Sequence, residues 1–173
     1  NSQIGFDDEV IAPYIPLNVQ DKTISLLGRK VTLQPNGFPA QITSYFKETL
    51  TEIGTEGLDI LSRPMELTTG ENWENLDFTY TKRKAGALGW HATNQNNQFI
   101  MNLDAQIESD GNMEYKVVLI ARKDGEINDI ALRTELAPNI AQYMMGLGEK
   151  GGYCPQNLDW KWGVEKNQDA LWT

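Results

Sequence analysis

Residues 99–121, FIMNLDAQIESDGNMEYKVVLIA, decide the fold of this 173-residue chain. In their first half, apolar side chains occupy every second position from Phe99 to Ile107, and mostly polar side chains lie between them. A period of two is typical of a strand with one buried face. Asp110-Gly111 then favours a tight reversal into a second alternating run, from Met113 to Ala121. We therefore predict two antiparallel strands over this stretch.

The same pattern continues toward the C-terminus. Asp124-Gly125 predicts another reversal, into a strand over Ile130, Leu132 and Leu136, so that three strands would form a meander. The middle strand is apolar on both faces from residue 117 to 120, which predicts an interior position in the sheet.

Working toward the N-terminus, short runs with the same period precede the stretch. They are Ile24 and Leu26; Val31 and Leu33; Leu76, Phe78 and Tyr80; and Leu88, Trp90 and Ala92. Pro35-Asn36-Gly37 predicts a tight hairpin, whereas Gly54 and Gly57 predict a loop or distorted hairpin over residues 47–57. Residues 138–145 fit either one helical turn or a strand. We predict an all-β protein: an antiparallel, supersandwich-like β-sandwich of about nine to twelve short strands with little helix.

Composition limits the classes of partner. The chain has 40% hydrophobic residues and a net charge of −9, from 24 acidic and 15 basic residues, with a pI near 4.6. One core and one domain over residues 1–173 are the simplest expectation. The negative charge argues against nucleic acid and anionic membrane surfaces as partners, and no apolar run is long enough to cross a bilayer.

Both ends of the sequence favour a piece of a longer protein. The first residue is Asn1 rather than Met, and the last, Thr173, follows the apolar run Ala170-Leu171-Trp172. Residues 1–16 contain acids and two prolines, which predicts an N-terminal arm lying on the domain. Residues 143–173 form a tail rich in Gly and Trp, which we expect to contact a missing catalytic domain.

The tail has the composition of a carbohydrate site. Aromatic rings cover the apolar face of a sugar, while carboxylates and amides bind its hydroxyl groups. The residues that we expect to contact glycan or the neighbouring domain are Tyr153, Asp159, Trp160, Trp162, Asn167 and Asp169. An interdomain role is an equal alternative for these side chains, because Trp and Tyr are also common buried anchors of interfaces.

Three segments carry a resemblance to a known family: LGRKVTLQPNGFPAQITSYF (27–46), YMMGLGEKGG (143–152) and DWKWGVEKNQDALW (159–172). Together they resemble the N-terminal β-sandwich domain of glycoside hydrolase family 123-like proteins, which precedes a (β/α)8 barrel. The likeness runs from about residue 16 onward. Two positions depart from it, because Gly163 stands where an Asp is expected and Ala170 where a Gly is expected.

The resemblance implies a non-catalytic accessory domain of a β-N-acetylgalactosaminidase-like hydrolase. In such proteins an Asp-Glu pair of the barrel and the acetamido group of the substrate carry out catalysis. The implied partner is a C-terminal catalytic domain of the same protein, glycan is a further partner, and the implied location is exported. The alternatives are an independent carbohydrate-binding module and a β-sandwich sugar epimerase or lyase.

The remaining candidate groups favour no catalytic or metal site of the chain's own. His91 is the only histidine and lies in an expected strand opposite the apolar face, so a structural role is favoured over a general base. Cys154 has no basic neighbour to activate its thiol. One His and one Cys exclude the usual zinc sets, and we expect no metal and no cofactor.

Overall fold

The computed structural model describes residues 8–127, 129–147 and 149–158, and these residues form thirteen strands and no helix. The all-β prediction is confirmed, with one strand more than expected. Two compact units make up the chain, one reaching Glu135 and one starting at Leu136. That residues 1–173 form one domain of a longer protein stays a prediction.

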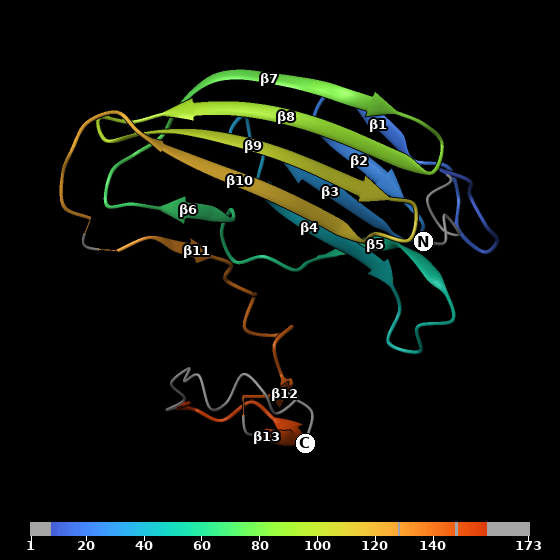
Figure 1. Ribbon diagram of the computed structural model, residues 1–173. Helices are drawn as coiled ribbons and strands as arrows, with labels where there is room; N and C mark the ends of the chain where they lie inside the picture. The colour runs from blue at the N-terminus through green and yellow to red at the C-terminus, as the bar shows by residue number, and fades with distance from the viewer. Residues whose placement is uncertain (1–7, 128, 148, 159–173) are drawn as a thin grey trace, which may run out of the picture. The chain divides into compact units, whose positions relative to one another are not determined.

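Two antiparallel sheets of the first unit form the sandwich, and Figure 1 shows one lying across the other. The five-stranded sheet has the order β1-β2-β3-β4-β5, with β1 (Asn18–Gln20), β2 (Thr23–Leu26), β3 (Arg29–Leu33), β4 (Pro39–Phe46) and β5 (Ile53–Asp59). The four-stranded sheet has the order β10-β9-β8-β7, with β7 (Glu74–Arg83), β8 (Ala87–Gln95), β9 (Phe99–Glu108) and β10 (Met113–Ala121).

The core lies between the two sheets. Its fully or nearly fully buried side chains are Ile24, Leu26, Val31, Leu33, Phe38, Leu88, Trp90, Ala92, Met101, Leu103, Ala105 and Ile107. In β2, β3, β8 and β9, the buried side chains occupy the alternate positions that the sequence pattern assigned to the apolar face of each strand. The period-two prediction is therefore confirmed for these four strands. At the centre, the Trp90 indole N–H donates to the Gly37 carbonyl oxygen at 2.9 Å, which joins β8 to the β3–β4 turn.

The predicted three-stranded meander is wrong in its last strand. β10 pairs with β9 through nine residues, but β11 (Ala131–Arg133) pairs with β6 (Glu66–Thr68) in a separate two-stranded sheet. β10 is therefore an edge strand, and the outer side chains Val118 and Ile120 are 41% and 47% exposed. Apolar residues on both faces predict an interior strand, but here the outer face of an edge strand is apolar.

Strand β7 departs from its expected alternation at its start. A register shift between Asn75 and Asp77 lets the extra residue, Leu76, turn outward, where it is 50% exposed, while Phe78 and Tyr80 contact the core. The distorted hairpin over residues 47–57 is confirmed, since the β4–β5 ladder shifts register between Ser44 and Phe46.

The described residues of the second unit contain one hairpin, β12 (Tyr143–Gly146) and β13 (Glu149–Tyr153), with a register shift between Met144 and Gly146. Residues 138–145, whose sequence fits either one helical turn or a strand, contain a turn followed by β12. Among the described residues, no helix is long and apolar enough to span a membrane.

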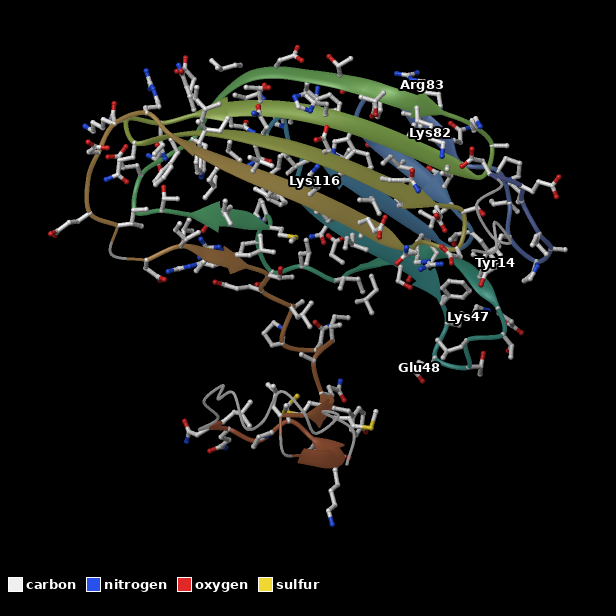
Figure 2. The ribbon with its side chains drawn as sticks, in the orientation of Figure 1. Tyr14, Lys47, Glu48, Lys82, Arg83 and Lys116 are labelled. Carbon is white, nitrogen blue, oxygen red and sulfur yellow. The ribbon has the colours of Figure 1, made fainter. Side chains whose placement is uncertain are left out.

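Two lysines of the basic run Lys82-Arg83-Lys84 contact an acidic side chain of the N-terminal segment. Figure 2 shows Lys82 and Arg83 at the end of β7. Asp8 accepts hydrogen bonds from the ammonium groups of Lys82 and Lys84, the latter at 2.6 Å, and its side chain is only 15% exposed. These hydrogen bonds hold the pKa of the Asp8 carboxyl below its ordinary value of 3.8.

We expect Asp8→Asn to lower the melting temperature at neutral pH, because it removes the charge that both lysines contact. A carboxyl with a lowered pKa in the folded state stabilises the fold above its unfolded-state pKa, and the effect is lost as the pH falls through the folded-state pKa. The difference between the two proteins should therefore begin to shrink near pH 3.8 and vanish at lower pH. Thermal melts from pH 7 to pH 2 measure it. Glu9→Gln is the matched control, since Glu9 is exposed and has no ion pair among the described residues; an equal effect of both substitutions would contradict a specific role of Asp8.

Candidate functional site

Only one of the six residues predicted to contact glycan or a neighbouring domain lies in the described chain. Tyr153 ends β13, is 76% exposed and pairs across the hairpin with Tyr143, which is 64% exposed. Their ring centroids are 4.8 Å apart with an interplanar angle of 31°. A hydrogen bond with Tyr153 raises the pKa of the Tyr143 phenol. Two exposed rings side by side offer the flat apolar surface that sugar faces cover.

The other five predicted residues, Asp159, Trp160, Trp162, Asn167 and Asp169, lie outside the described residues. Their assignment to glycan or interdomain contact stays a prediction.

His91 belongs to a hydrogen-bonded network on the outer face of the four-stranded sheet. Its Nδ1 lies 2.7 Å from Asp104 Oδ1, on the facing position of β9, and its Nε2 lies 3.1 Å from Thr93 Oγ1. Thr93 Oγ1 in turn donates to Asn102 Oδ1 at 3.2 Å. The order hydroxyl, imidazole, carboxylate is that of an acyl-transfer triad. Asp104 lines a hollow of about 370 Å³ between β9 and β10, whereas His91 and Thr93 are not among its lining residues.

Cys154 is an exposed free thiol just after β13. Among the described residues, no three His, Cys, Asp or Glu side chains are grouped as metal ligands would be. The structure thus adds no support for a nucleophilic cysteine or a metal centre in this part of the chain.

The most site-like feature lies at one end of the sandwich, where β7 begins, β8 ends and β10 ends (Figure 1). Two hollows of about 570 Å³ each flank the loop between β6 and β7, and we call them together the loop-end groove. Gly70, Glu71 and Asn72 line both hollows. The first is completed by Glu74, Gln95, Asn96, Asn97 and Arg122, and the second by Gln34, Asn36, Arg63, Glu66, Leu67, Thr68, Trp73 and Arg133.

Hydrogen bonds between loops fix the frame of the groove. The Trp73 indole N–H donates to the Leu67 carbonyl at 2.6 Å, and the half-buried ring packs on the core while also lining the second hollow. Asn75 Nδ2 donates to the Pro35 carbonyl at 2.7 Å, which links β7 to the β3–β4 turn. Buried Asn96 donates to Thr69 Oγ1 at 3.0 Å. The walls are therefore set before any ligand arrives.

Among the described residues, some charged side chains of the groove contact a group of opposite charge, and others do not. Arg63 contacts two carboxylates, Glu66 at 2.6 Å and Glu135 at 3.2 Å. Glu71 accepts from the Asn97 backbone N–H at 3.0 Å, and Glu74 accepts from the Gln95 side chain at 2.8 Å. By contrast, neither Arg122 nor Arg133 contacts a carboxylate in the described chain. The Arg122 guanidinium donates to the Asn96 carbonyl at 2.6 Å.

Sequence reasoning missed this groove. The run GENWEN, residues 70–75, has the same mixture of aromatic, amide and acid as the tail. That mixture was the available signal. The arginines and the other amides come from segments far apart in the sequence, and nothing in their spacing indicates that they share one surface.

The described residues of the first unit thus form an antiparallel β-sandwich with a polar groove built from loops at one end. The chain belongs to a glycoside hydrolase family, since the family described as glycoside hydrolase 123, third domain, matches residues 17–173. This supports the family named by the resemblance, but not the N-terminal position expected for the domain. No curated protein and no solved structure matches the chain.

Proposed function

We propose that this chain is a non-catalytic accessory domain of an exported, β-N-acetylgalactosaminidase-like glycoside hydrolase, and that it braces the catalytic barrel of the same protein. The observation that carries the proposal is the match over residues 17–173 to the third domain of a glycoside hydrolase family, because a third domain implies others in the same chain.

Two features of the described chain support a bracing role. β5 is an edge strand, six of its seven residues are exposed, and Leu58 is 46% exposed on it. The neighbouring β4–β5 hairpin, whose tip carries Lys47 and Glu48 in Figure 2, adds Leu50 and Ile53 with 74% and 50% exposure. Exposed apolar side chains beside a free strand edge are typical of surfaces that contact another domain.

The test compares the parent hydrolase with a version lacking residues 17–173, using 4-nitrophenyl β-N-acetylgalactosaminide as substrate. We expect the shortened hydrolase to keep measurable turnover and to melt at a lower temperature, and the isolated 173-residue chain to show no turnover. Turnover by the isolated chain would overturn the non-catalytic role. An unchanged melting temperature of the shortened hydrolase would overturn the bracing role.

The loop-end groove favours a second candidate function, that of a carbohydrate-binding module. A half-buried Trp beside amides and carboxylates in a preformed hollow is the combination that saccharide sites use. The two functions are compatible, because the groove and the β5 edge are formed by different residues.

A further inference from the structure

We propose that the loop-end groove binds an oligosaccharide that carries anionic groups, either carboxylates or sulfate esters, with Arg133 and Arg122 as the residues that recognise them. The proposal rests on the proposed function, because membership of a glycoside hydrolase supplies the saccharide class. The groove supplies the location and the charge.

The first step is the fit to a saccharide. The Trp73 ring is held by its hydrogen bond to the Leu67 carbonyl and lines the second hollow, so it offers a fixed apolar surface to a sugar ring. Asn72 is exposed at the rim of both hollows and has no hydrogen bond to another described residue through its side chain. Its amide is thus available to hydroxyl groups on either side of the loop.

The second step is the sign of the ligand charge. Three acids of the groove accept hydrogen bonds from its own groups: Glu66 from the Arg63 guanidinium, Glu71 from the Asn97 backbone N–H and Glu74 from the Gln95 amide. Of the three, only Glu66 is paired with a positive charge among the described residues. One arginine in each hollow, Arg122 in the first and Arg133 in the second, contacts no carboxylate of the described chain. In a chain with 24 acids and 15 bases, two guanidinium groups in one groove are left for an external anion.

The net charge of −9 does not oppose this assignment. At physiological ionic strength charges are screened over about 8 Å, so acids elsewhere on the surface act weakly in the groove. The planar guanidinium group forms paired hydrogen bonds with carboxylates and with sulfate-like oxyanions.

The test measures binding by the isolated 173-residue chain with isothermal titration calorimetry. The probes are three hexasaccharides of similar size: hyaluronan, which carries only carboxylates; sulfated cellohexaose, which carries only sulfate esters; and chitohexaose, which is neutral. We expect at least one anionic probe to bind about tenfold or more tightly than chitohexaose. Which of the two binds identifies the anionic group. No binding of either anionic probe, or equal binding of all three, overturns the proposal.

Matched substitutions locate the binding site. Arg133→Gln should weaken binding of the anionic probe about tenfold, because it removes the charged guanidinium group but leaves an exposed polar side chain. Arg83→Gln is the control, because it removes the same charge at the far end of β7, where Arg83 lies 4.4 Å from the Tyr80 ring centroid. It should leave affinity unchanged. Equal losses in both variants would indicate nonspecific attraction and overturn the assignment to the groove.

Trp73→Phe tests the aromatic surface. A smaller ring keeps most of the packing on the core, so the variant should fold, with its melting curve as the check. We expect severalfold weaker binding of the anionic probe, because stacking area and the fixed indole orientation are lost. Unchanged affinity would show that the Trp73 ring does not contribute to ligand binding. All of these measurements use the chain without a catalytic domain. A negative result would therefore not contradict the bracing role, which the deletion experiment tests separately.

Discussion

Trp90→Ala is expected to cause the largest loss of stability, about 3–5 kcal/mol, which is the range for truncation of a buried large aromatic side chain. Trp90 is fully buried between the two sheets and makes an edge contact with Tyr115, with ring centroids 6.0 Å apart. The substitution leaves a cavity and also removes the indole donor to the Gly37 carbonyl. Urea unfolding followed by tryptophan fluorescence and circular dichroism would measure the loss.

Trp90→Phe separates the two causes. It keeps most of the aromatic volume but leaves the Gly37 carbonyl without its donor, which costs about 1–3 kcal/mol for a buried acceptor. We therefore expect an intermediate loss. If Trp90→Ala and Trp90→Phe were equally destabilising, the cavity would contribute nothing and the hydrogen bond would be the sole contribution of Trp90.

Gly37→Ala is expected to cause the second largest loss, about 2–5 kcal/mol, from left-handed backbone strain together with overpacking. Gly37 has a φ of +93°, in the region that favours glycine. A Cβ there would lie 2.8 Å from Leu103 Cδ2 and 3.0 Å from Ala92 Cβ, both of which are buried on the facing sheet. Ala92 Cβ cannot move without displacing β8, and the Leu103 side chain can move only by repacking its buried neighbours. Urea unfolding again provides the measurement.

Two other glycines separate strain from overpacking. Gly70 has a φ of +86° with no atom within 4 Å of an added Cβ, so Gly70→Ala should show the cost of strain alone. Gly125 has open space as well and is not among the glycines with a positive φ, so Gly125→Ala should be close to neutral. A Gly37→Ala loss no larger than that of Gly70→Ala would contradict tight packing of the β3–β4 turn against the facing sheet.

The same contacts relate the core to the groove. Gly37 follows Asn36, which lines the second hollow, and the Asn94 side chain donates to the Asn36 carbonyl at 3.1 Å. The turn that contributes to the groove is therefore held by Trp90 and Asn94, both fully buried. Loosening this turn by Trp90→Phe should also weaken any ligand binding in the second hollow, because a less fixed wall loses preorganisation.

The period-two alternation predicted strands correctly where one face of the strand is buried and the other is exposed to solvent. The alternation from Phe99 to Ile107 predicted β9 and its buried side chains, and Pro35-Asn36-Gly37 predicted the β3–β4 turn. It was a poor guide to the neighbours of a strand. Val118 and Ile120 indicated an interior strand, yet they are exposed on an edge, because periodicity reports which residues face which side and not what covers that side.

The sequence by itself determined the fold class, most strand faces and the resemblance to glycoside hydrolase family 123, because each depends on residues close together along the chain. Only the tertiary structure brought together the loop-end groove, whose arginines 63, 122 and 133 come from three separate segments. Which carboxylates each arginine meets is decided by how the strands pair and pack. That pairing depends on contacts between residues many positions apart, and local periodicity does not predict such contacts.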